Sequence, residues 1–257
     1  MDYWRREQIG ASTGIAAAVL AVAASLVVRT FPDPSATDEA VRDFLATNRT
    51  DLLTQAWLFG LSLAAGIWFL GSLRGFLRRA EGGAGRVSAI AYGAGLLTIA
   101  SFGLGLVCMI GASYPVTATT DPAIPAAIFQ LGNAAVTLAA FPIMVLAASV
   151  TLVIATTRTL PLLLAGIGAV VAVVAVIASL SLFVDSGAMA VGGDFTFYGP
   201  FVAAQAWLLA LSAMLIPRLA RPTDVRLARR RIGDVEGRAP RVWEGQERRA
   251  AEGRRDG

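Results

Sequence analysis

Six stretches without a single Asp, Glu, Arg or Lys residue constrain this chain of 257 residues more than any motif does. Each is long enough to cross about 30 Å of hydrocarbon, which takes about 20 helical residues. Inside lipid the backbone must satisfy its own hydrogen bonds, and the polar–apolar alternation of a membrane barrel is absent, so helices are predicted. The six predicted spans cover residues 9–28, 52–73, 87–112, 125–156, 160–184 and 199–217.

The fold class expected from this pattern is all-α, a bundle of six transmembrane helices. The first apolar run has features of a cleaved signal peptide, because Arg5 and Arg6 precede it and Ala21-Val22-Ala23 resembles a cleavage site. The run is longer than a usual signal core, however, and long enough to span a membrane. We therefore expect it to be retained as the first membrane helix.

Arginine residues alternate between the connections, and they predict the orientation. Four lie in the second connection, from Arg74 to Arg86, and Arg158 is in the fourth, whereas the outer connections are poorer, with three in the first and none in the third and fifth. Positive residues favour the cytoplasmic side, so both termini are predicted inside. All 22 basic residues are Arg, which suggests a GC-rich bacterial genome and hence the inner (cytoplasmic) membrane.

The last segment, residues 218–257, holds twelve Arg and seven acidic residues. It is expected to be a largely disordered cytoplasmic tail that interacts with anionic lipid head groups. No fold or aromatic interleaving supports nucleic-acid binding, so none is expected.

A short surface helix is predicted over residues 36–49, in the long first outer connection. Ser35 and Asp38 suit a capping box, and Val41, Phe44 and Leu45 form part of an apolar stripe. Two interpretations stay open: a helix that covers the bundle, and a lid or docking surface for an external partner.

An octapeptide occurs almost twice, as QAWLFGLS at residues 55–62 and QAWLLALS at residues 205–212. A third glutamine lies midway, with a spacing of 75 residues on each side, and a hydroxyl residue follows each glutamine by seven positions. Seven residues are close to two helical turns, so each glutamine shares a helix face with its hydroxyl residue. The pairs are Gln55 with Ser62, Gln130 with Thr137, and Gln205 with Ser212.

These pairs indicate either three repeated two-helix units or a packing pattern shared by the even-numbered spans. Pro125 and Pro200 precede two of the glutamines by five residues. Because proline suits the first helical turn, the three glutamines are expected at one depth near the outer surface, facing one another. They would act as interhelical glue or line a polar vestibule for a small ligand.

The fourth span adds two candidates. Asn133 lies near the face of Gln130 and Thr137, and Pro142 should kink the helix because it removes the bond to the carbonyl of Leu138. The kink is interpreted as a hinge or as ordinary packing.

No catalytic constellation is visible. No span has a charged residue in its middle, there is no His, and Cys108 is the single cysteine, so neither a metal site nor a cofactor is expected. We expect a non-enzymatic structural or accessory membrane protein, for which an unidentified protein partner is a candidate. The alternative is a facilitative transporter or binding protein for a small neutral or polar molecule.

The six-span pattern, the segment GSLRGFLRRAEGG at residues 71–83 and the Arg-rich end together resemble bacterial multi-pass integral membrane proteins of unknown function. This resemblance implies a membrane bundle and no particular activity.

Overall fold

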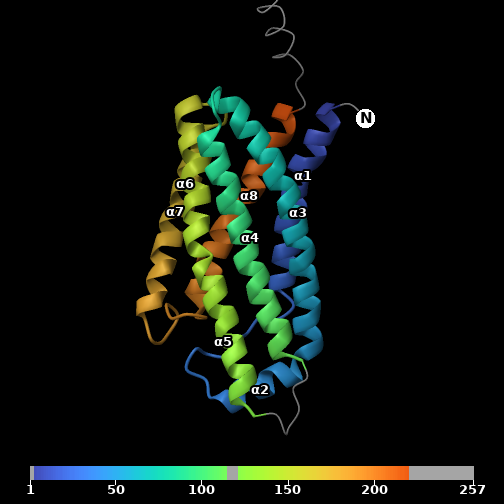
Figure 1. Cartoon of the computed structure of the whole chain (residues 1–257), viewed down its shortest axis with the longest axis vertical. Coiled ribbons are helices and arrows are strands. Elements are labelled where there is room, and N and C mark those ends of the chain that lie inside the picture. Colours follow the sequence, from blue (N-terminus) through green and yellow to red (C-terminus); the bar gives the residue numbers. More distant parts are fainter. Residues whose placement is uncertain (1–2, 115–120, 220–257) are drawn as a thin grey trace, which may run out of the picture. The chain divides into compact units, whose positions relative to one another are not determined.

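A computed structural model describes residues 3–114 and 121–219. The chain divides into two units, Met1–Arg218 and Leu219–Gly257, and almost all of the predicted tail lies outside the described residues. Every regular element of the described part is helical (Figure 1). The elements are α1 (Tyr3–Ser25), α2 (Asp38–Thr47), α3 (Arg49–Glu81), α4 (Arg86–Ala112), α5 (Ala123–Leu138), α6 (Ala140–Thr157), α7 (Leu162–Ser179), the short 3₁₀ helix η1 (Leu180–Phe183) and α8 (Asp194–Leu219).

Six segments of the described chain are long and apolar enough to cross a membrane, as predicted: Gln8–Ser25, Arg49–Glu81, Arg86–Ala112, Ala123–Thr157, Leu162–Phe183 and Asp194–Arg218. α5 and α6 together form the fourth segment, and α7 with η1 forms the fifth. Leu97, Leu163 and Val173 are among the many large apolar side chains on the surface of the bundle. Such a surface suits lipid and would be unfavourable in water.

Successive spans run in opposite directions, so the connections gather at two ends (Figure 1). We call the end where α2 lies, and where α5 and α8 begin, the α2 end; the turn between α3 and α4 lies at the opposite end. α3 packs against both α1 and α4, and α6 packs against α4 and α7. α8 contacts α1 through Ser212 against Gly14, α3 through Phe201 against Phe59, and α7 through Trp207.

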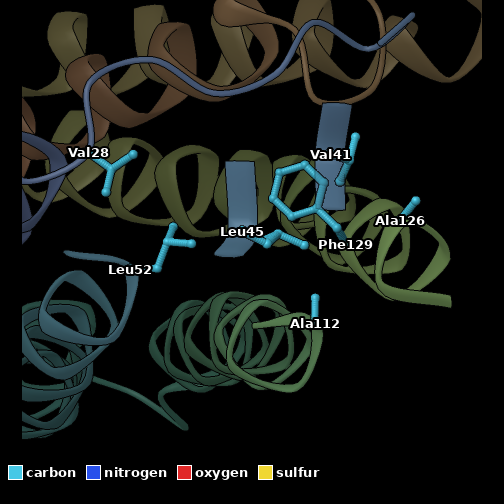
Figure 2. Packing of buried hydrophobic residues seen from close by; sticks show 7 residues of the cluster. All are labelled: Val28, Val41, Leu45, Leu52, Ala112, Ala126 and Phe129. Atoms are coloured by element: carbon cyan, nitrogen blue, oxygen red, sulfur yellow. The ribbon is translucent and has the colours of Figure 1, made fainter. Parts of the chain in front are cut away.

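α2 lies across its end of the bundle and covers the ends of α3, α4 and α5. Val41 and Leu45 of α2 are almost fully buried, at 2% and 0% exposure. Figure 2 shows the ring of Phe129 from α5 beside these two side chains, in a cluster that also holds Val28, Leu52, Ala112 and Ala126. The predicted surface helix is therefore present, slightly shorter than expected, and its apolar stripe faces the bundle.

The capping residue of α2 differs from the prediction. Thr37, rather than Ser35, is the N-cap, and its hydroxyl accepts a hydrogen bond from the backbone N–H of Ala40 at 3.3 Å. Ser35 instead donates to Asp33 through its hydroxyl, at 2.5 Å, and through its backbone N–H, at 2.9 Å. These two bonds lower the pKa of the Asp33 carboxyl. The local turn before the helix competes successfully for the Ser35 side chain.

α3 extends two turns beyond the predicted span because the charged segment after Arg74 is also helical. It ends at Gly82, which adopts a left-handed conformation with φ of 64°, and Gly85 has φ of 66°. The Glu81 carboxylate then accepts hydrogen bonds from the backbone N–H groups of Val87 and Ser88, at 3.0 and 2.9 Å. These bonds satisfy two free donors at the start of α4.

The fourth segment is interrupted at Ala139, between α5 and α6. Pro142 has no N–H to donate to the carbonyl of Leu138. The backbone N–H of Ala139 bonds to Val136 at 3.1 Å, a tighter spacing than that of a regular α-helix. The break lies where the proline predicts a kink. The hinge role of Pro142 stays a prediction.

Candidate functional site

A cavity of about 90 Å³ lies near the α2 end, among α3, α4, α5 and the first turns of α8. Phe31 and Pro32, in the connection between α1 and α2, form part of its wall. The cavity is partly open. Its walls therefore come from segments far apart in the sequence, and two connections at the α2 end contribute to them.

Aromatic side chains form much of the wall. They are Phe31, Phe59, Phe102, Phe129, Phe197 and Tyr198. Phe31 lies at the centre of this set, with its ring centroid 6.4 Å from those of both Phe129 and Phe197. Phe197 contacts Tyr198 edge-on, with centroids 5.0 Å apart. Such ring pairs stabilise one another beyond simple burial, so these rings make a shaped apolar wall.

Gln55 of α3 is the most unusual residue of the lining. Its side chain is 1% exposed, and neither the amide nitrogen nor the amide oxygen has a hydrogen-bond partner. Leaving one buried polar group unpaired costs about 1–3 kcal/mol. Because both atoms lack partners, exchanging the nitrogen and oxygen of the amide would not change this conclusion. A complete donor–acceptor pair thus lies in a buried position on the cavity wall.

α5 brings Asn133 and Thr137 to the same cavity because it packs very closely on α4. A β-carbon at Gly132 would lie 3.3 Å from the carbonyl oxygen of Gly105, and one at Gly105 would collide with Val136. Glycines at both positions let the two backbones approach. This contact orients α5 so that its Asn133 and Thr137 face lies on the cavity.

The connection before α8 completes the site. Gly192 has φ of 82°, a conformation that favours glycine, and a β-carbon there would lie 2.8 Å from the amide nitrogen of Asn133. Asp194 begins α8 and lines the cavity, although its side chain is exposed. The hydroxyl of Thr196 donates to the carbonyl of Ala190 at 2.9 Å, and that of Tyr198 donates to the carbonyl of Arg29 at 3.4 Å.

The electrostatic character of the site follows from this lining. All the lining residues belong to the described part of the chain, none of them is basic, and Asp194 supplies the one carboxylate. The lining offers the buried amide of Gln55, the buried hydroxyl of Thr137 and the half-buried amide of Asn133. The site therefore suits uncharged polar groups and disfavours anions.

The predicted glutamine cluster is wrong in its geometry. Gln130 is exposed and does not line the cavity, because it lies at the rim of the α5 face that buries Ala126 and Phe129. Gln205 is half-buried and is also absent from the lining. α8 begins six residues before Pro200, rather than at it, so Gln205 lies further along its helix than the prediction assumed.

The hydroxyl residues that follow the glutamines by seven positions also lie in different surroundings. Ser62 donates to the carbonyl of Ala17 on α1 at 2.8 Å, a direct interhelical bond. Ser212 is fully buried, and its hydroxyl has no partner. Of the seven residues in the predicted polar set, Gln55, Asn133 and Thr137 come together at the cavity.

Sequence reasoning missed the contribution of Asp194 and of the aromatic wall. The segment GGDFTFYG holds Asp194, Phe197 and Tyr198, and its adjacent glycines were a usable signal for a turn. Nothing in the local sequence indicates that this turn would lie against Asn133, since the contact joins residues about 60 positions apart.

No family model, no curated protein and no solved structure matches this chain. The functional argument therefore rests on the residues and the geometry described above.

Proposed function

We propose that this chain is a multi-pass membrane protein that binds a small polar molecule in the cavity at its α2 end. The observation that carries the proposal is the Gln55 amide, buried on the cavity wall with neither polar atom paired. The unpaired amide lowers the stability of the fold when no ligand is bound. A ligand that completes its hydrogen bonds offsets this cost, which explains why such a residue lies on the cavity wall.

The alternative role for the glutamines, interhelical glue, has less support. Gln55 makes no hydrogen bond to another helix, and Gln130 is exposed. The hydroxyl of Ser62 bonds across helices, and so does the indole of Trp207, which donates to the carbonyl of Leu164 at 3.3 Å. Bundle cohesion thus has other sources, and Gln55 is free for a ligand.

The proposed orientation places the cavity on the outer side of the cytoplasmic membrane. Arg74, Arg78 and Arg86 belong to the end opposite α2, around the turn between α3 and α4. Arg218, near the end of α8, donates to the backbone carbonyl of Thr159 between α6 and α7. The connection around α2 has three Arg residues (Arg29, Arg42 and Arg49) but five acidic ones, so this end is net acidic. This separation supports cytoplasmic termini and an outward-facing site.

Binding is tested with the full chain in lipid nanodiscs. The melting temperature is measured with and without a panel of small sugars, polyols, amides, amines and carboxylates at millimolar concentrations. A ligand stabilises the folded state by mass action, so at least one class should raise the melting temperature. The Gln55→Leu variant should lose this response, and the Gln130→Leu variant should keep it. An identical response in wild type and Gln55→Leu would refute the proposed site.

Facilitative transport is a second step of the same proposal. It requires the bound molecule to leave toward the other side, and we assign the change of angle to the break at Ala139, which separates α5 from α6 next to Thr137. Proteoliposome flux of the panel's best ligand tests this directly. Flux that equals that of empty liposomes would restrict the role to binding.

A further inference from the structure

The chemical class of the ligand can be inferred from the groups that line the cavity, if the proposed function is correct. Gln55 presents one acceptor, Oε1, and one donor group, Nε2, and both are buried without partners. A ligand that satisfies both must donate and accept at neighbouring atoms. Carboxamides, ureas and lactams have this arrangement at neutral pH. Carboxylates only accept, and ammonium or amidinium groups only donate.

The charge of the ligand narrows the possible ligand classes further. A bound anion would lie among aromatic rings with no basic group in the lining and with Asp194 nearby. Moving an unpaired charge out of water is far costlier than moving a neutral amide. An organic cation has the aromatic faces and Asp194 in its favour, but Asp194 is exposed, and a cation would leave the Gln55 amide N–H group unsatisfied.

Size is limited by the cavity. An apolar cavity of about 150 Å³ accommodates a benzene molecule. The volume of about 90 Å³ therefore corresponds to a ligand fragment of roughly four heavy atoms. A planar carboxamide with one small substituent is of this size, and its flat faces suit walls made of Phe129 and Phe197 rings.

We propose that the cavity recognises an uncharged carboxamide or urea group, which pairs with the side-chain amide of Gln55 through two antiparallel hydrogen bonds. Asn133 of α5 also lines the cavity and carries a second side-chain amide. The site is thus selective for neutral donor–acceptor groups over charged groups of the same shape.

Four small probes of nearly equal shape test this class. Acetamide both donates and accepts, acetone accepts, acetate is an anion, and acetamidinium is a cation. Binding to the full chain in nanodiscs is measured by ligand-observed NMR titration. Acetamide should bind in about the millimolar range, because so small a ligand makes few contacts. It should bind about tenfold tighter than acetone, the effect of one buried hydrogen bond, and at least about tenfold tighter than acetate and acetamidinium, whose charges must also be desolvated.

Two variants make the test specific. Gln55→Met keeps the length of the side chain and removes its hydrogen-bonding groups, so acetamide and acetone should then bind equally. Gln130→Met makes the same replacement at an exposed residue and should keep the tenfold preference. A side chain with a merely structural role would alter the overall affinity and leave the preference unchanged.

The possible results separate this inference from the proposed function. Tightest binding of acetamidinium, lost in Asp194→Asn, would overturn the carboxamide class and leave the binding site in place. Equal binding of all four probes would also overturn it. If none of the four binds but another class in the stability panel does, the carboxamide class is again refuted. If neither experiment shows a ligand response that depends on Gln55, both proposals fail.

Discussion

The two octapeptides QAWLFGLS and QAWLLALS occupy different surroundings, although six of their eight letters agree. In the first, Gln55 is buried and Trp57 is 65% exposed. In the second, Gln205 is half-buried and Trp207 is 4% exposed, with its indole N–H bonded to α7. Even the serines differ, since Ser62 has a partner on α1 and Ser212 has none.

The difference follows from which face of each helix is covered by neighbours, because α3, like α8, contacts several other helices. Residues two apart on a helix point about 200° apart, so a Gln and the Trp two positions later cannot face one neighbour. α8 contacts α1, α3 and α7 on different sides, and it can cover Trp207 while Ser212 faces α1. The face of α3 that carries Trp57 is uncovered. The same residues therefore form a helix in both places, but the neighbouring helices determine which of their side chains are buried.

Replacing the two tryptophans should produce the largest contrast. Trp207→Ala removes a buried indole and its bond to Leu164, and should lower the free energy of unfolding by about 3–5 kcal/mol. Trp57→Ala removes a side chain from the surface and should change it by less than about 0.5 kcal/mol. Reversible unfolding in mixed micelles measures both. Equal losses would show that the two positions are structurally equivalent after all.

The second contrast uses the same Gly→Ala change at two helical positions. A β-carbon at Gly14 would collide with the Ser212 hydroxyl and the Phe69 ring, whereas one at Gly60 meets nothing within 4 Å. Gly14→Ala should destabilise the protein by about 1–3 kcal/mol. Gly60→Ala, which makes the first octapeptide more like the second, should stabilise it by about 0.5–1 kcal/mol.

Both variants gain the same helix propensity, so their difference isolates the close approach of α1, α3 and α8. If Gly14→Ala were as stable as Gly60→Ala, the tight contact between Gly14 and Ser212 would be wrong. Unfolding in the same micelles provides the measurement.

The glutamines give the third contrast, measured without ligand. Gln55→Leu removes a buried amide with two unpaired atoms and should raise the free energy of unfolding by about 1–2 kcal/mol. Gln130→Leu, at an exposed position, should have an effect near zero. If Gln55 were interhelical glue, the first variant would instead be less stable than wild type, so the sign of the change distinguishes the two roles.

The sequence predicts the helical class and the six apolar segments because both depend on local composition. Whether a run lacks charged residues, and how long it is, can be read from consecutive residues. In lipid, the backbone N–H and C=O groups of such a run must bond to one another, so the run forms a helix. The break near Pro142 and the apolar stripe of α2 could also be predicted, because each depends on residues close together in the sequence. Where the prediction of an element erred, as at the start of α8, charged or turn residues were themselves helical.

The site is less predictable because it depends on contacts between distant segments. Regular spacing correctly marked Gln55 as unusual but wrongly placed Gln130 and Gln205 beside it. The close contact of Gly105 with Gly132 determines the rotation of α5, which exposes Gln130. The periodicity of residues along either helix does not predict this contact. The hydroxyl of Ser62 likewise finds its acceptor on α1, 45 positions away.

The smallest contrast concerns the two serines that end the octapeptides. Ser62→Ala removes one interhelical hydrogen bond, and such bonds in membranes average about 0.6 kcal/mol. Ser212→Ala removes a buried hydroxyl without a partner, so it should be neutral or slightly stabilising. A loss on Ser212→Ala as large as on Ser62→Ala would mean that Ser212 has a bonding partner, such as an internal water molecule, and that the two octapeptides are joined to α1 in the same way.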